Sequence, residues 1–151
     1  MSVRLAIDVG TVRIGIAKSD AQGKVALPLT TLKNDENLLK NLVDIVKQEE
    51  SEVIYLGLPL NLKGQVTHSA SKALKFASQL QQALPGVTVL MIDERFTSKT
   101  AAAQLQQAGL SSKESRGLVD QISALGLLEQ ALQIEERTGS LAGTPPNDWD
   151  V

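Results

Sequence analysis

The chain has 151 residues, of which 42% are hydrophobic, and this is enough for one domain with an ordinary core. It contains no cysteine and one histidine, which excludes a disulfide framework, a thiolate metal site and a zinc site built on several histidines. The formal net charge of −2 excludes a global attraction to nucleic acid, so binding to a polyanion would need a local patch or a metal ion.

The first part of the chain predicts three short strands joined by turns. Residues 3–9, 13–18 and 25–30 are apolar and rich in β-branched side chains. Gly10 and Gly23 fall in the segments between them, where a turn is expected. This arrangement is typical of an antiparallel meander.

Helices and buried strands then alternate. Residues 35–47 and 66–84 repeat apolar side chains at three- and four-residue steps, which predicts two amphipathic helices. Residues 52–58 and 87–92 are continuous apolar runs, as expected for strands buried on both faces. A meander followed by alternating helices and strands predicts an α/β fold, with a five-stranded mixed sheet and helices on both faces.

The remainder of the chain is predicted to be helical and then flexible. A short helix is expected over residues 98–107 and a longer one over residues 118–137. Residues 138–151 are small, proline-containing and aperiodic, which indicates a flexible tail. We therefore expect one domain over residues 1–137.

No apolar run approaches the roughly 18 residues that a membrane helix needs. The apolar stretch at the start of the chain is short and is broken by Asp8, so it does not resemble a targeting segment. We therefore expect a cytoplasmic protein that has no contact with a membrane.

Acidic residues stand at the ends of the predicted core elements. Asp8 lies near the end of the first strand, Asp93 and Glu94 follow the strand at residues 87–92, and Asp120 is expected in the first turn of the last helix. Ligands gather at the carboxyl ends of parallel strands, so these acids can meet at one edge of the sheet. Carboxylates brought together repel one another and raise one another's pKa, and a bound Mg²⁺ or Mn²⁺ offsets this repulsion.

Each acid also has a purely structural interpretation. Asp8, two residues before Gly10, is a common turn former. Asp93 and Glu94 can simply be exposed at the end of a strand. Asp120 can stabilise the N-terminal end of its helix through the helix dipole. The joint placement of the acids, rather than any one of them, favours a metal site.

Four motifs resemble those of the YqgF family, in the same order and spacing. They are "IDVGTVRIGIAKSD", "GLPLNLKG", "DERFTSKTA" and "RGLVDQISA", and the resemblance covers about residues 3–136. Members of that family are described as nucleases of pre-16S ribosomal RNA and as Holliday junction resolvases. The resemblance implies a ribonuclease H-like fold and a metal-dependent hydrolase acting on structured nucleic acid, either precursor rRNA or branched DNA.

The resemblance also implies roles for particular residues. Asp8, Glu94 and Asp120 match the acidic catalytic positions of the family and would hold Mg²⁺ or Mn²⁺. We expect hydrolysis by water without a covalent enzyme intermediate. Four basic residues are candidates for contact with the phosphates: Arg13, Lys63, Arg95 and Arg116.

Two other classes of function remain open at this point. The run Asp8 to Thr11 also resembles the first phosphate motif of the actin, chaperone and sugar-kinase ATPases, in which Asp8 would help to hold magnesium-ATP. Those proteins close two such domains on the nucleotide. A non-catalytic binding module on the same fold is the other alternative. The chain is expected to be a monomer or a homodimer, and a junction resolvase would favour the dimer.

Overall fold

Five strands form one mixed sheet in the structure, which is a computed structural model. It describes residues 2–94 and 112–149, apart from the side chains of residues 112–120. The strands are β1 (Arg4–Val9), β2 (Arg13–Ser19), β3 (Ala26–Lys33), β4 (Val53–Leu58) and β5 (Thr88–Asp93). Their order in the sheet is β3-β2-β1-β4-β5. The first three pair antiparallel, whereas β4 is parallel to both β1 and β5. The predicted mixed α/β sheet is confirmed.

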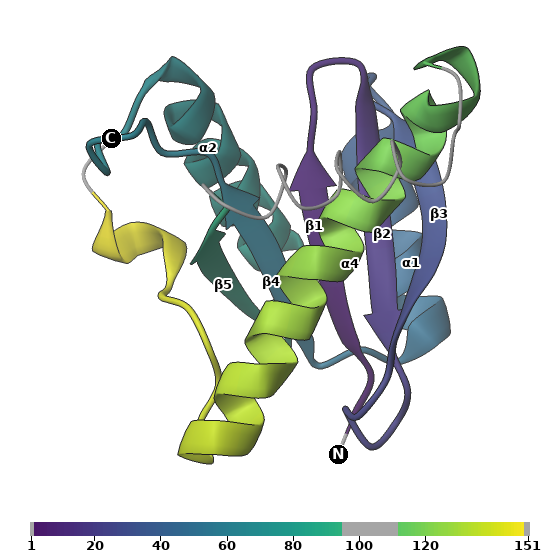
Figure 1. Cartoon of the computed structure of the whole chain (residues 1–151), viewed down its shortest axis with the longest axis vertical. Helices are drawn as coiled ribbons and strands as arrows, with labels where there is room; N and C mark the ends of the chain where they lie inside the picture. The colour runs from purple at the N-terminus through teal and green to yellow at the C-terminus, as the bar shows by residue number, and fades with distance from the viewer. Residues whose placement is uncertain (1, 95–111, 150–151) are drawn as a thin grey trace.

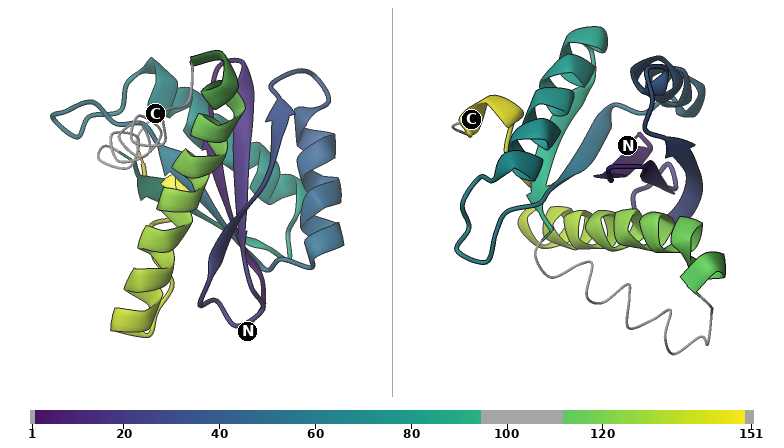
Figure 2. Two further views of the ribbon diagram at one scale, coloured as in Figure 1. Left: turned by 45° about the vertical axis from the view of Figure 1, so that its right-hand side comes forward. Right: turned by 90° about the horizontal axis from the view of Figure 1, so that it is seen from above.

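Helices cover both faces of the sheet (Figures 1 and 2). α1 (Leu38–Glu49) and α2 (His68–Ala83) lie on one face, and α4 (Ser112–Thr138) crosses the other. Alternate residues of each central strand face opposite cores, because side chains of a strand alternate in direction. Leu5 and Ile7 of β1 therefore pack with α1 and α2, while Ala6 packs on the side of α4.

α4 begins six residues earlier than expected. The polar run at residues 112–117 lacks the apolar repeat by which a helix is recognised, so the predicted start at residue 118 was wrong. Asp120 consequently lies in the third turn of α4, not in the first. The field of a helix terminus acts mainly within the first turn, so the dipole explanation for Asp120 loses its basis. The short helix predicted at residues 98–107 falls outside the described residues.

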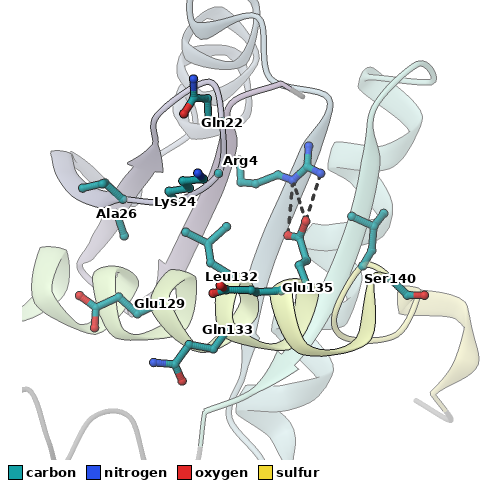
Figure 3. Close-up of a pocket in the computed structure, with 14 residues that line it drawn as sticks. Arg4, Gln22, Lys24, Ala26, Glu129, Leu132, Gln133, Glu135 and Ser140 are labelled. Carbon is teal, nitrogen blue, oxygen red and sulfur yellow. Dashed lines mark hydrogen bonds and ion pairs between the residues drawn. The ribbon is translucent and has the colours of Figure 1, made fainter.

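A polar network fixes the C-terminal half of α4 to the sheet. The Arg4 guanidinium donates to the Glu135 carboxylate, with the closest N–O distance at 3.1 Å (Figure 3). The hydroxyl of the fully buried Tyr55 also donates to Glu135, at 2.6 Å, and accepts from the backbone N–H of Ala142 at 3.2 Å. Burial and the Glu135 carboxylate raise the pKa of Tyr55, so the phenol keeps its proton. The network holds β1, β4 and α4 together at the end of the sheet where β1 begins.

Replacing Tyr55 with phenylalanine should lower stability without affecting the opposite end of the sheet. The change removes the acceptor of the buried Ala142 N–H and one donor to Glu135. Leaving such a group unpaired costs about 1–3 kcal/mol. Urea unfolding of Tyr55→Phe should show this loss in the free energy of unfolding, and any activity that depends on the opposite end of the sheet should stay within about twofold of the parent at a temperature where both are folded. A large loss of activity in the folded variant would contradict the separation of the two ends.

The segment after α4 lies against the sheet. Sequence composition predicts a flexible tail here, whereas residues 139–149 occupy a defined path along β5 to α2. Met91 and Thr144 exchange backbone hydrogen bonds of 2.7 and 3.1 Å. Gly143 permits this approach, since it has a φ of 74° and a Cβ there would collide with the Met91 carbonyl. Backbone pairing and the packing of Trp149 on the core give this segment order that its composition does not indicate.

Candidate active site

Two of the predicted acids, Asp8 and Glu94, lie at the edge of the sheet where β1, β4 and β5 end. Asp8 pairs with Gly15 of β2. On its other side Ile7 pairs with Leu56, so the residue that follows, Gly57, lies next to Asp8. Ala6 and Tyr55 belong to the core under α4. Asp8 and Gly57 lie two residues after them in the same strands, so they face the same side of the sheet. This small area beside the α4 core is the candidate site.

Asp8 and Glu94 are hydrogen-bonded to each other through their side chains. Both are half-buried, and Glu94 is held directly beyond β5 by its backbone N–H, which donates to Leu58 O at 3.3 Å. Burial raises the pKa of Glu94 to about 8, and the negative charge of Asp8 and the hydrogen bond to it act in the same direction. Asp93 contributes a smaller effect of the same sign. Two carboxyl groups this close repel each other when both are charged, and this repulsion contributes to the raised pKa of Glu94.

Gly57 provides the space that the Glu94 carboxylate occupies. A Cβ at position 57 would collide with Glu94 Oε2 and would lie 3.2 Å from Glu94 Cδ. It would also lie 2.9 Å from Leu127 Cδ1 of α4. Gly57 lies inside β4 and is covered by the side chains of Glu94, directly after β5, and of Leu127 in α4.

The third predicted acid, Asp120, belongs to the half of α4 that lies over the same edge. The neighbouring Gln121 donates from Nε2 to Thr31 Oγ1 of β3 at 2.9 Å, and Thr31 pairs with Gly15 beside Asp8. The side chain of Asp120 is outside the described part. Among the side chains that are described, no group of three acids or histidines is arranged to hold a metal ion. The structure thus brings together Asp8 and Glu94.

The predicted phosphate contacts lie in different settings. Arg13 is half-buried at the start of β2, on the edge where β1 ends. Lys63 is exposed in the loop after β4, and its backbone N–H donates to Asn61 Oδ1. Arg95 and the side chain of Arg116 fall outside the described residues.

Two residues near this edge were missed by the sequence analysis. Lys33 is exposed and pairs with Arg13 across the β2–β3 hairpin, so two cations stand side by side. Asn34 fixes the loop after Asp8, because its Nδ2 donates to Gly10 O at 2.8 Å and its N–H to Val12 O at 2.9 Å. Extending the hairpin register from the turn would have paired Arg13 with Leu32 instead, because a bulge between Ile16 and Ala17 shifts the register by one residue. Nothing in the sequence marks Asn34.

A pocket of about 970 Å³ lies far from the acids. It is lined by the β2–β3 turn and the end of α4, and Arg4 and Glu135 form part of its wall (Figure 3). This ion pair joins β1 to α4, and the pocket beside it lies at the end of the sheet opposite Asp8 and Glu94. The candidate site is therefore the pair of Asp8 and Glu94, and not this pocket.

Similarity to solved structures identifies the fold. The chain is similar to Thermus thermophilus RuvC in complex with a Holliday junction substrate, with a TM-score of 0.62 and 15% identity over 95% of this chain and 99% of that one. It is also similar to fowlpox virus resolvase, with a TM-score of 0.57 and 13% identity over 87% and 97% of the two chains. At such identities the likeness shows the fold alone, which is ribonuclease H-like.

Sequence relatives then give the family. A chain from Mycobacteroides abscessus is 38% identical, with 94% of this chain and 87% of the relative aligned. One from Kineococcus radiotolerans is 39% identical, with 93% and 76% aligned. Both are provisionally named pre-16S rRNA nucleases. Residues 2–134 match the RuvX family, described as Holliday junction resolvases, and the chain belongs to that family. Membership of this nuclease family favours the nuclease interpretation over the ATPase one.

Among residues 2–94 and 112–149, none of the helices has the length and apolar character that crossing a bilayer requires.

Proposed function

We propose that this protein is a divalent-metal-dependent nuclease whose centre contains Asp8, Glu94 and Asp120. The observation that carries the proposal is the hydrogen-bonded pair of Asp8 and Glu94 at the edge where β1 and β5 end. Two acids at the ends of strands that are not neighbours in the sheet meet here, and their repulsion when both are charged supports the binding of a cation at this point.

The donor set fits Mg²⁺ or Mn²⁺. All the proposed ligands are carboxylate oxygens, which hard divalent cations prefer. α4 packs on the sheet through Ala124 and Leu127. Position 120 lies one helical turn before Ala124 and two turns before Leu127, and this spacing supports Asp120 as the third ligand. When bound, the cation would polarise the scissile phosphate and lower the pKa of water. Asp8 and Glu94 would hold it and, once deprotonated, supply the negative charge that it needs.

Basic residues around the acids would position the phosphate backbone. Arg95 follows Glu94 directly and Arg116 lies one turn before Asp120 in α4, which supports both as phosphate contacts. Arg13 stands with Lys33 on the same edge of the sheet. Lys63 would reach the substrate from the loop after β4. Arginine offers two parallel donors to a phosphate, which suits it to this task.

Precursor 16S rRNA is the first candidate substrate, because the relatives that are 38% and 39% identical to this chain carry that name. A DNA four-way junction is the second, supported by the description of the family. The two differ in assembly, since symmetric cutting of a junction needs two active sites and a homodimer, while trimming of RNA is possible for a monomer. Either role would be carried out in the cytoplasm, which supports the expected cytoplasmic location.

The test offers both substrates to the purified protein with Mg²⁺ and, separately, with Mn²⁺. Mapped cuts near the end of the 16S sequence in precursor rRNA would support the first candidate, and paired symmetric nicks in the junction would support the second. Light scattering on the same samples gives the oligomeric state. Cleavage of neither substrate with either metal would contradict the proposal, and micromolar binding of magnesium-ATP in calorimetry would favour the ATPase alternative.

A further inference from the structure

Resting on the nuclease function proposed above, we infer that Gly57 is a positioning residue whose missing side chain places the Glu94 carboxylate beside Asp8. Gly57 is itself unable to bind substrate or metal through a side chain. Its effect comes from the space that it leaves on the α4 side of β4.

Two elements use that space. Glu94 Oε2 lies so close to the position of a Cβ on Gly57 that the two would overlap. Leu127 Cδ1 of α4 approaches the same point to 2.9 Å, against the 3.4 Å or more of an ordinary contact. The absence of one side chain therefore lets the acid that follows β5 and a leucine of α4 meet over the α4 face of β4.

The position of Gly57 in the sheet makes this space important for the site. β4 lies between β1 and β5, so any side chain on its α4 face separates an acid of β5 from one of β1. Gly57 is the residue next to Asp8 in the register, and the hydrogen bond between Glu94 and Asp8 must pass over it. Every other residue type at position 57 would add a Cβ that overlaps the Glu94 carboxylate.

An alanine at position 57 should displace Glu94 and leave the backbone in place. The two conflicting atoms, Glu94 Oε2 and Leu127 Cδ1, are the far ends of flexible side chains, which rotate away more easily than a strand shifts, and the overlap with Glu94 is the larger one. The Glu94 carboxylate would then leave Asp8, and a displacement of about 1 Å can reduce turnover by about 100-fold. Substrate binding away from the metal ligands would be retained.

The experiment compares Gly57→Ala with Gly86→Ala. Gly86 lies in the turn before β5, and a Cβ there meets nothing within 4 Å. We expect Gly57→Ala to lower kcat by about 100-fold, with KM for the nucleic acid changed less than threefold and more Mn²⁺ needed for half-maximal activity. Gly86→Ala should match the parent. A parent protein without any cleavage would refute the proposed function, whereas an active parent with Gly57→Ala equal to Gly86→Ala would overturn the positioning role alone.

A stability cycle tests the same inference without activity. Gly57→Ala is made both in the parent and in Glu94→Ala, where the conflicting carboxylate is absent. The midpoint of urea unfolding should fall clearly in the parent background and much less in Glu94→Ala, and a Gly57→Ala that folds only together with Glu94→Ala would also support the inference. Equal losses in both backgrounds, or failure of both to fold, would show that Gly57 serves the packing of Leu127 and not the position of Glu94.

Discussion

Asp8→Asn is expected to abolish cleavage and to leave the protein folded. The amide that replaces the carboxylate keeps the shape of the side chain and can still donate a hydrogen bond to Glu94, so the strand and its neighbours need not move. The substitution removes a full negative charge from the proposed metal ligands. Residues one shell further out in metal sites contribute about 10–100-fold, so loss of a ligand should reduce kcat by more than about 100-fold.

The measurement is the single-turnover cleavage rate at saturating Mn²⁺, with circular dichroism and thermal melting as the checks on folding. Asp44→Asn provides the matched control, because Asp44 is an exposed acid of α1 on the opposite face of the sheet. That variant should cleave at the parental rate. An Asp8→Asn protein that cuts as fast as Asp44→Asn would remove Asp8 from the mechanism.

The metal-free protein should lose stability as the pH rises from 6 to 9. The pKa of Glu94 is raised from 4.5 to about 8 on folding, so the folded state holds a proton that the unfolded state releases between these values. The contribution to stability is complete below about pH 4.5 and is lost as the pH rises through about 8. The slope for one proton is at most about 1.4 kcal/mol per pH unit.

Glu94→Gln should flatten this dependence, because an amide does not titrate. Urea unfolding at pH 6, 7.5 and 9, with EDTA present, measures the effect, and Glu52→Gln serves as the control at an exposed acid outside the site. Added Mn²⁺ should raise the parent's melting temperature more at pH 8.5 than at pH 6, since ligands must be deprotonated to bind it. The same pH profile in Glu94→Gln and Glu52→Gln would show that Glu94 does not cause it.

The elements of the fold were predictable where one face is apolar. The strands at β4 and β5 appear in the sequence as unbroken apolar runs, and α1 and α2 as apolar repeats, because each packs against a core. The start of α4 was not predictable, since residues 112–117 offer no such repeat. The path of residues 139–149 depends on a backbone pairing with Met91, and such pairing leaves no pattern in side chains.

The candidate site was predictable in its residues and less so in its geometry. Asp8 and Glu94 were singled out because each ends a strand, and the structure brings them into contact. The part played by Gly57 depends on which strand lies between β1 and β5, and this is set by the order of the sheet. The Asp120 ligand stays a prediction, supported by its place in α4.

The backbone pairing of Thr144 with Met91 affects the tendency of the protein to self-associate. An outer strand with unpaired amide and carbonyl groups is a template on which a strand from another molecule can add. Here the chain's own terminal segment occupies part of that template on β5, and Gly143 keeps it close enough to do so. The segment thereby blocks part of the β5 edge from pairing with another molecule, and a protein shortened after α4 should aggregate more readily through that edge.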